Sequence, residues 1–266
     1  MSSRGRAPLL AHDDRGSGPA VVLLHSGVTD RGMWTPVMPA LSNARRVIAP
    51  DLRGFGETPV PGGPYADADD VVHLLDALGV GRAAFVGASF GGRVALEVAA
   101  RHPDRVSSLV LLCTAYRGLE VTDPVVQAFG EREEELIEAG DVDGAVALNV
   151  ATWVGPQASE QARADVARMQ RRAFEVQLAA DALDPPPQPE RVEVEPGSIH
   201  VPTLVVSGAL DVAHHRDIAT LLAREIDGAE LVELDWAGHL PSVERPDETA
   251  ALVLEHLDRE GVRPTG

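Results

Sequence analysis

The chain contains no lysine, so arginine supplies all 23 of its basic residues. Without lysine, no reaction can proceed through a lysine Schiff base. The single cysteine, Cys113, cannot form an internal disulfide. It lies in the apolar segment Leu109–Thr114, where no electropositive setting that would activate a thiol is visible. We therefore expect Cys113 to be a small core residue.

Long hydrophobic runs are also missing. No apolar stretch approaches the roughly 20 residues of a membrane span, and Met1–Pro8 lacks the apolar segment of a signal peptide. The net charge of −18 argues against nucleic acid and anionic membrane surfaces as partners, and it disfavours anionic substrates. These absences predict a cytoplasmic protein.

Apolar runs of strand length alternate with segments of helical spacing over most of the chain. Such continuous runs are typical of strands buried on both faces of a parallel sheet. We expect strands at Ala7–Asp14 (an edge strand), Ala20–Leu24, Arg46–Pro50, 82–87, Val106–Leu112, Thr203–Ser207 and Ala229–Leu234, and helices at 67–78, 90–101, 214–226 and 246–259. The alternation predicts an α/β fold with a doubly wound, mostly parallel sheet of about seven to eight strands.

The alternation stops between residues 116 and 199. Helical candidates at Val125–Ala139, Val142–Trp153 and Ser159–Leu183 follow one another there, and the proline-rich segment 184–189 reads as a linker. We expect a core formed by residues 1–115 and 200–266, with residues 116–199 inserted as a helical cap. Because the insertion follows a strand end, it can cover the carboxyl edge of the sheet, where ligands bind in open α/β sheets.

Ser89 lies in a pattern that suits a nucleophile. Gly87–Gly91 has the form G-x-S-x-G, between the apolar run 82–86 and the helical segment 92–101. A strand, a sharp turn and a helix are the context in which this pattern exposes the serine hydroxyl at a helix N-terminus. The alternative is a glycine-rich turn with a bystander serine.

A serine nucleophile needs a base, and the base needs an orienting carboxylate. Asp211 follows the expected strand Thr203–Ser207, and His239 follows the next strand. We expect them to be the acid and the base, although Asp211 could instead cap a helix. Asp235 is the nearest competitor for the acid, and Asp123 is a more distant one.

The remaining histidines and the loop after residue 24 have expected roles as well. The backbone N–H groups of Phe90 and of Gly27, with Val28 as second choice for the latter, are expected to stabilise an oxyanion. His25 is expected to hold its loop by hydrogen bonds. His214 and His215 are adjacent, so their spacing does not suit a metal site, and we expect them to be solvent-exposed or at the rim of a pocket.

Taken together, the chain resembles the α/β-hydrolase fold superfamily. The resemblance rests on His25–Gly27, Asp51–Gly56, Gly87–Gly92 and the pair Asp211 and His239, and it covers nearly the whole chain. It implies that Ser89 is the nucleophile, His239 the base and Asp211 the acid, whereas Asp51 and Arg53 stabilise loops. The usual His-Gly is replaced by His25-Ser26, and the first of the usual eight strands is expected to be absent.

These residues predict a hydrolase that cleaves a small carboxylic ester or lactone through an acyl-enzyme, without a metal or cofactor, as a monomer or homodimer. The residues expected to line its pocket are Val28, Trp34, Phe90, Tyr116, Trp153 and Leu240. Trp34 and Trp153 could equally belong to the core. The cap region and the loop at Met33–Trp34 resemble those of 3-oxoadipate enol-lactonases. A serine at position 89 argues against a haloalkane dehalogenase or epoxide hydrolase. Alternatives are a carbon–carbon bond hydrolase, a non-hydrolytic cyclase, or a ligand receptor with slow turnover.

Overall fold

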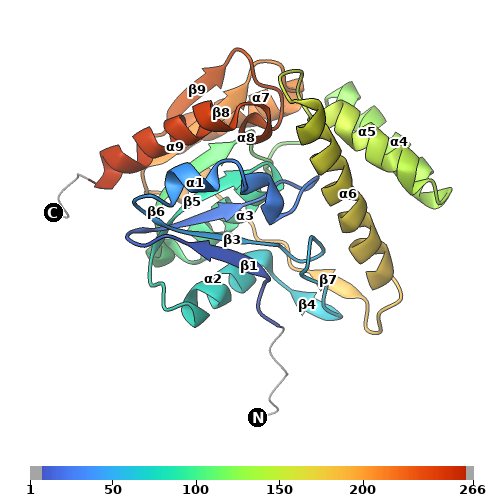
Figure 1. Ribbon diagram of the computed structural model, residues 1–266, viewed down its shortest axis with the longest axis horizontal. Coiled ribbons are helices and arrows are strands. Elements are labelled where there is room, and N and C mark those ends of the chain that lie inside the picture. Colours follow the sequence, from blue (N-terminus) through green and yellow to red (C-terminus); the bar gives the residue numbers. More distant parts are fainter. Residues whose placement is uncertain (1–7, 262–266) are drawn as a thin grey trace, which may run out of the picture.

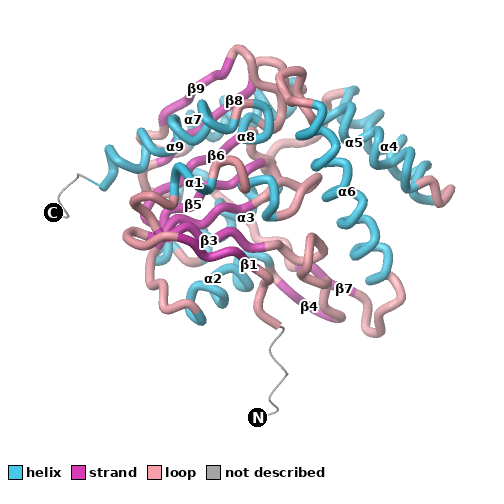
Figure 2. Tube along the Cα trace, in the orientation of Figure 1, coloured by secondary structure: helices cyan, strands magenta, loops and turns pink. Residues whose placement is uncertain are grey.

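The computed structural model describes residues 8–261, and its centre is one seven-stranded sheet (Figures 1 and 2). The strands are β1 (His12–Arg15), β2 (Ala20–Leu24), β3 (Arg46–Pro50), β5 (Ala83–Ala88), β6 (Val106–Leu112), β8 (Thr203–Gly208) and β9 (Glu230–Leu234). Their order is β1-β3-β2-β5-β6-β8-β9. Only β1 pairs antiparallel with its neighbour, and the other pairings in this sheet are parallel. The predicted fold class is thus confirmed.

Helices cover both faces of this sheet. Alternate residues of a strand point to opposite faces, so Val22 of β2 packs in one apolar cluster and Val21 in the other. The first cluster includes α2 (Asp67–Ala77), α3 (Phe90–Arg101) and α7 (Ala213–Glu225), and the second includes α1 (Met38–Leu41) and α9 (Pro246–Gly261). Burial on both faces explains why the inner strands are continuous apolar runs.

The first strand differs from its expected position. We expected Ala7–Asp14, of which Ala7 lies outside the described residues, whereas β1 spans His12–Arg15. Antiparallel pairing with β3, from His12 opposite Pro50 to Arg15 opposite Val47, determines where the strand begins and ends. The preceding Leu10 is buried in the core and is not part of the sheet.

Three longer helices follow β6 and lie together at one side of the molecule (Figure 1). They are α4 (Pro124–Glu138), α5 (Val142–Trp153) and α6 (Glu160–Ala180). A small apolar cluster of Leu136, Ala145, Val146 and Phe174 joins them. Helix α6 ends at Ala180, three residues before the expected Leu183, as the chain turns towards Pro185.

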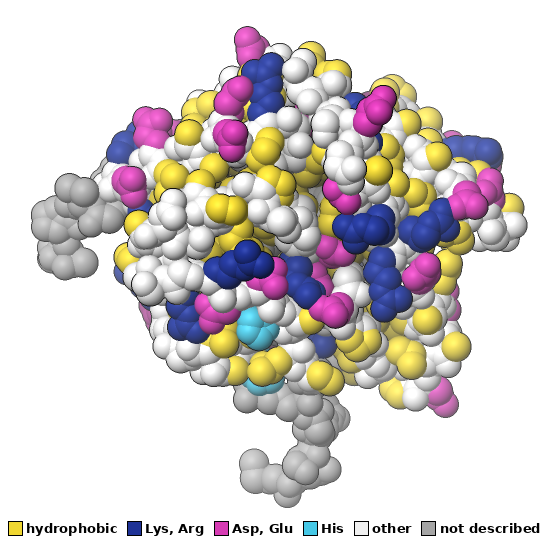
Figure 3. Space-filling model, viewed as in Figure 1, with side chains coloured by type: hydrophobic (Ala, Val, Ile, Leu, Met, Phe, Trp, Pro, Cys, Tyr) yellow, Lys and Arg dark blue, Asp and Glu magenta, His cyan; other side chains and the backbone are white. Residues whose placement is uncertain are grey.

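Short elements complete the described chain. They are β4 (Gly63–Tyr65), β7 (Pro187–Pro189), α8 (Pro241–Glu244) and the 3-10 turns η1 (Arg31–Trp34), η2 (Pro103–Arg105) and η3 (Pro196–Ser198). Part of the expected linker at 184–189 is therefore a strand, since β7 pairs in parallel with β4. No helix of the described chain is both long enough and apolar enough to cross a membrane. On the face in Figure 3, arginine and acidic side chains lie next to one another.

Candidate active site

Ser89, Asp211 and His239 lie beyond the carboxyl ends of three parallel strands of the sheet, β5, β8 and β9. Ser89 separates β5 from α3, Asp211 follows β8, and His239 follows β9. Ser89 has a φ of 49° and a ψ of −112°, which is a strained conformation for a residue with a side chain. The sharp strand-to-helix turn predicted from the sequence is therefore present.

The glycines around Ser89 permit close approach of the backbone. A Cβ atom at Gly87 would lie 2.5 Å from the carbonyl oxygen of Gly91, and one at Gly91 would lie 2.2 Å from that of Leu24. At Gly92 it would lie 2.2 Å from Thr114 Oγ1. Glycine is required here because neighbouring atoms fill the space where a side chain would begin.

The three side chains form one hydrogen-bonded chain. Ser89 Oγ lies 2.8 Å from His239 Nε2, and His239 Nδ1 lies 2.8 Å from Asp211 Oδ2. Because an ionised carboxylate only accepts hydrogen bonds, Nδ1–H donates to Asp211 and Nε2 is left to accept from the serine hydroxyl. The arrangement can draw a proton from Ser89.

Asp211 is ionised in a buried position. Burial by itself would raise the pKa of Asp211, but the charge of His239 and the hydrogen bond from it outweigh burial and hold the pKa below its usual value. The backbone N–H of Val212 donates to Asp211 Oδ1 at 2.7 Å. Asp235 is exposed, and Asp123 caps α4 by accepting from Val125 N–H. Neither competitor contacts His239.

The two residues whose amides are expected to stabilise an oxyanion, Gly27 and Phe90, lie next to Ser89. A Cβ atom at Gly27 would lie 3.5 Å from Phe90 Cβ, so the two loops are adjacent. Neither amide donates to another group within residues 8–261. Val28 N–H, the second choice for the loop donor, lies 3.4 Å from Ser26 Oγ. Because Val28 N–H already has this partner, Gly27 is the better candidate for the loop donor.

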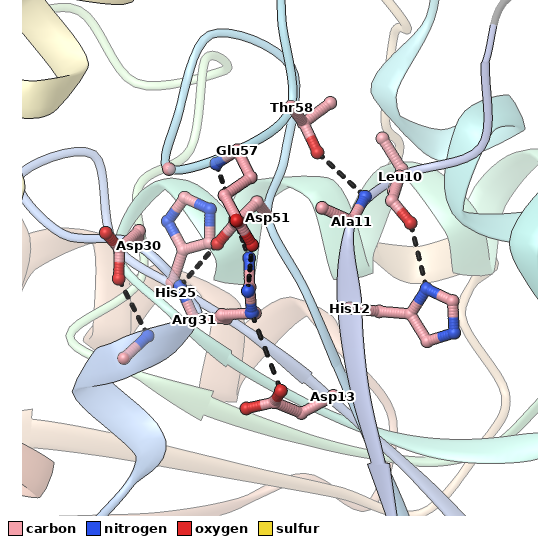
Figure 4. A network of polar contacts seen from close by, with 12 residues as sticks. Leu10, Ala11, His12, Asp13, His25, Asp30, Arg31, Asp51, Glu57 and Thr58 are labelled. Carbon is pink, nitrogen blue, oxygen red and sulfur yellow. Dashed lines mark hydrogen bonds and ion pairs between the residues drawn. The ribbon is translucent and has the colours of Figure 1, made fainter.

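A buried network holds the loop that carries Gly27 (Figure 4). His25 Nδ1 donates to the carbonyl of Ser26 at 2.8 Å, and Nε2 accepts from Leu52 N–H at 3.0 Å. Burial lowers the pKa of His25, which keeps the ring neutral for these two roles. Asp51 accepts from the backbone N–H of Arg31 and of Glu57, each at 2.9 Å, and pairs with the Arg31 guanidinium.

Arg53 holds a second part of the same region. Its Nε lies 2.9 Å from Asp70 Oδ2, and its Nη2 donates to the carbonyl of Pro8 at 2.6 Å. Arg53 thus joins the loop after β3 to helix α2 and to the first described residues. Contacts of this kind stabilise loops, as the resemblance implied for Asp51 and Arg53.

Glu244 connects the loop of His239 with the α5–α6 connection. Its carboxylate accepts from Gly238 N–H at 2.9 and 3.1 Å, next to His239. A Cβ atom at Gly155 would lie 2.0 Å from the same carboxylate. Burial raises the pKa of Glu244, although hydrogen bonds from the backbone of Gly238, Gln157 and Leu240 oppose that rise. Glu244 is a residue that sequence patterns did not single out, because its partners are backbone amides.

His214 and His215 are both buried, so the expectation of solvent exposure is wrong and the alternative at a pocket applies. They lie in the first turn of α7, the helix that follows β8 in the chain. The ring of Trp153 lies 4.8 Å from that of His239 and 5.8 Å from that of His215. Helix α5 therefore reaches the site through its last residue.

Two cavities open at Ser89. The larger, about 630 Å³, is lined in part by Phe90, Tyr116 and Trp153, and the smaller, about 220 Å³, by Gly27, Val28 and Trp153. Trp34 and Leu240 line neither cavity, which corrects the expected place of Leu240 and leaves the core alternative for Trp34. Both are fully buried in the apolar cluster beneath α1 and α9.

Sequence patterns missed several residues of these cavities. Phe129, Glu133 and Asn149 come from α4 and α5, far from Ser89 in the chain. Arg93 lines the larger cavity and follows Ser89 by four residues, the spacing that places two side chains on one face of a helix. That spacing is a signal from which Arg93 could have been found.

Cys113, Asp211 and His239 present potential ligand atoms within 4.8 Å of one another. Asp211 and His239 are already hydrogen-bonded to each other, and the Cys113 thiol lies 3.5 Å from the carbonyl oxygen of Gly238. Burial raises the pKa of Cys113, and the charge of Asp211 adds to the effect, which keeps the thiol protonated. A protonated thiol is a poor metal ligand.

The match to the α/β hydrolase fold family covers residues 19–246, and the chain therefore belongs to this family. The expected enzyme class in its broad form, a hydrolase, agrees with this family. The 2-hydroxymuconate semialdehyde hydrolase of Pseudomonas putida is 31% identical over 266 residues, which is 92% of this chain and 89% of that relative.

Two further similarities bear on the reaction. A 2-hydroxymuconate semialdehyde hydrolase from Pseudomonas sp. (strain CF600) is 41% identical over 128 residues, and the chain spans only 44% of that relative's length. The enol-lactonase from Burkholderia xenovorans LB400 has a TM-score of 0.76 and 30% identity, over 94% of this chain and 96% of that structure.

Proposed function

We propose that the protein hydrolyses a small carboxylic ester or lactone through an acyl-enzyme on Ser89. The observation that carries this proposal is the chain of two 2.8 Å hydrogen bonds from Ser89 through His239 to Asp211. The strained backbone of Ser89 and the two adjacent amides at Gly27 and Phe90 support it. The likeness to a solved enol-lactonase agrees with a lactone or ester as substrate.

In the first step Ser89 Oγ attacks the carbonyl carbon while His239 Nε2 takes the hydroxyl proton. The carbonyl oxygen becomes negative and accepts hydrogen bonds from the amides of Phe90 and Gly27. The carbon–oxygen bond to the leaving group then breaks, and His239 returns its proton to that oxygen. Water, deprotonated by His239, cleaves the acyl-enzyme and restores Ser89.

Residues 116–199 act in this proposal as a cap over a core formed by residues 1–115 and 200–266. Trp153 at the end of α5 contacts the ring of His239, and Phe129 of α4 lies 4.9 Å from Trp153. A site covered by two aromatic side chains suits a small molecule better than a polymer.

The test is steady-state hydrolysis of p-nitrophenyl esters from acetate to octanoate, by wild type and by Ser89→Ala. Loss of the nucleophile should lower kcat by about 10³-fold or more. Ser198→Ala, at an exposed serine in η3, is the matched control and should keep its activity. Undiminished turnover by Ser89→Ala with any of these esters would refute the covalent mechanism.

A second candidate is hydrolysis of a carbon–carbon bond by the same three side chains. The similarity over most of the chain to a 2-hydroxymuconate semialdehyde hydrolase favours it. Product analysis distinguishes the two, because cleavage of a vinylogous diketone yields an acid and a ketone or dienol. A lactone or ester instead yields an acid and an alcohol or enol.

A further inference from the structure

The loop that carries Gly27 closes as a tight turn. The backbone N–H of Thr29 donates to the carbonyl oxygen of Ser26 at 3.2 Å, which makes Ser26–Thr29 a four-residue turn with Gly27 at its second position. The same carbonyl oxygen accepts from His25 Nδ1 at 2.8 Å. Two donors therefore fix the direction in which the Ser26 carbonyl points.

Fixing this carbonyl also fixes the Gly27 amide. The C=O of Ser26 and the N–H of Gly27 belong to one peptide unit, which is planar and trans, so the two bonds point in opposite directions. The groups that hold Ser26 therefore aim the N–H that is expected to stabilise the oxyanion.

The side chain of Met33 holds both ends of the turn. Its Sδ accepts from the backbone N–H of Ser26 at 3.3 Å and from the hydroxyl of Thr29 at 3.0 Å. Ser26, Thr29 and Met33 are all buried, with at most 2% of each residue exposed. Within residues 8–261 the sulfur is the acceptor on which the Ser26 N–H depends.

The hydroxyl protons of the turn fit this arrangement. Thr29 Oγ1 lies 3.0 Å from Ser26 Oγ, and Val28 N–H lies 3.4 Å from Ser26 Oγ. With the Thr29 proton directed at the sulfur, the Ser26 hydroxyl donates to Thr29 Oγ1 and accepts from Val28 N–H. Among the described residues, Gly27 is then the one member of the turn whose N–H is left for a substrate.

The position of Met33 explains why a thioether suits this role. The 3-10 turn η1 places Met33 seven residues after Ser26 and in contact with it. Met33 also belongs to the apolar cluster that includes Val166 and Met169 of α6. A thioether is apolar enough for this cluster and yet accepts hydrogen bonds. Leucine would fill a similar volume but would leave a buried N–H without a partner, which is unfavourable.

We propose that Met33 is a positioning residue for the reaction at Ser89, because its sulfur fixes the turn Ser26–Thr29 and so aims the Gly27 N–H at the oxyanion. The inference rests on the proposed hydrolytic function of Ser89. Met33 lines neither cavity at Ser89, so it acts through the turn and not on the substrate.

The test compares Met33→Leu with Met38→Leu, the matched control. Met38 is buried in the same apolar cluster, but its sulfur accepts no hydrogen bond from the described residues. Met33→Leu should lower kcat for p-nitrophenyl acetate about tenfold with KM within about twofold, since a displaced donor forfeits part of the roughly 10²- to 10³-fold that a missing oxyanion donor costs. Met38→Leu should keep the kcat of wild type.

Three readouts distinguish positioning from a loss of folded protein. The value of kcat is taken per active site, with the sites counted by complete labelling with a fluorophosphonate. The inhibition constant of a trifluoromethyl ketone, whose adduct with Ser89 carries the oxyanion, should rise about tenfold in Met33→Leu, in parallel with the fall in kcat. The pH profile of kcat/KM should keep its shape, because His239 is unchanged. Equal kcat per site in Met33→Leu and Met38→Leu, or an unchanged inhibition constant, would overturn the proposal.

Norleucine provides a test at a single atom. Expression with norleucine in place of methionine exchanges each sulfur for a methylene group at all four methionines and leaves the side-chain shape nearly unchanged. The norleucine protein should show the same tenfold loss of kcat, and norleucine should cause no further loss in Met33→Leu. This test holds if Met33→Leu does not fold. Full activity of the norleucine protein would refute the role of the sulfur.

Amide hydrogen exchange separates the role of Met33 from the hydrolysis. The Ser26 amide, followed by NMR, should exchange about tenfold faster in Met33→Leu than in wild type and should not change in Met38→Leu. That pattern without hydrolysis of any ester would refute the proposed hydrolysis alone. Equal exchange in the three proteins would refute the role of Met33 whatever the kinetics show.

Discussion

The imidazole rings of His215 and His239 lie 4.3 Å apart, yet only His239 contacts Ser89 and Asp211. Burial, followed by the charge of His239, lowers the pKa of His215 to about 3. His215 is thus neutral at every pH at which a histidine base works. His239 can therefore transfer protons, whereas His215 contributes a neutral surface to the cavities at Ser89.

This relationship predicts the pH dependence of His215→Gln. Activity should fall as the pH is lowered, because His239 must be neutral to accept the proton of Ser89. Replacing His215 should leave the shape of the profile of kcat/KM from pH 5 to 9 unchanged, because His215 does not titrate there. His200→Gln, at an exposed histidine, is the control. An inflection above pH 5 that disappears with His215 would contradict the assignment.

The acid assignment is tested by a pair of aspartates. Asp211→Asn should lower kcat by about 10³- to 10⁴-fold, because the amide no longer holds His239 in the productive tautomer. Asp235→Asn changes the exposed competitor and should stay within about twofold of wild type, as surface substitutions do. Hydrolysis of p-nitrophenyl acetate measures both. The reverse ranking would mean that Asp235 is the acid.

Replacement by alanine should have opposite effects on stability at two glycines, Gly91 in the turn after Ser89 and Gly130 in helix α4. Gly91→Ala places a Cβ atom 2.2 Å from the carbonyl oxygen of Leu24, and backbone cannot move aside. We expect it to lower the free energy of unfolding by about 3 kcal/mol or more. Gly130→Ala meets open space within helix α4 and should raise stability by up to about 1 kcal/mol. Urea unfolding measures both, and equal effects would contradict the packing argument.

Asp67 makes folding stability depend on pH. Burial raises its pKa to about 7, with Arg93 opposing, and its Oδ1 accepts no hydrogen bond from the described residues. Between about pH 4 and 7 the unfolded chain loses this proton while the folded chain keeps it, so stability falls as the pH rises. Asp67→Asn should therefore match wild type near pH 4 and exceed it at pH 8.

The gain at pH 8 should be up to about 4 kcal/mol, because each unit of pKa shift corresponds to about 1.4 kcal/mol. Urea unfolding at the two pH values measures it. Asp227→Asn, at an exposed residue, is the control and should show no such pH dependence. A gain of the same size at both pH values would show that ionisation of Asp67 is not the cause.

Much of the sheet could be predicted because its inner strands are buried on both faces. Ala20–Leu24 and Val106–Leu112 were expected with the bounds that the structure shows. The hydrogen-bonded group of Ser89, Asp211 and His239 could be proposed for a related reason. Each of these residues follows a strand, and the carboxyl ends of parallel strands lie at the same edge of the sheet. Local sequence contains both signals.

Other features depend on contacts between distant parts of the chain. The pairing of β4 with β7 joins residues more than 120 positions apart. Leu240 belongs to the core because it packs in one apolar cluster with residues of α1 and α9, which no pattern around Leu240 indicates. Phe129, Glu133 and Asn149 of the smaller cavity were missed for the same reason, because they come from α4 and α5, far from Ser89 in the chain.

Because Cys113 is buried, a single introduced cysteine can be labelled to measure whether the α4–α6 region moves. Cys113 is the one thiol of the chain, it is buried, and burial raises its pKa, so a thiol reagent has little access to it. A cysteine introduced at the exposed Val125, at the start of α4, would therefore carry a fluorophore at a single defined point. Its emission would show whether this region moves during turnover.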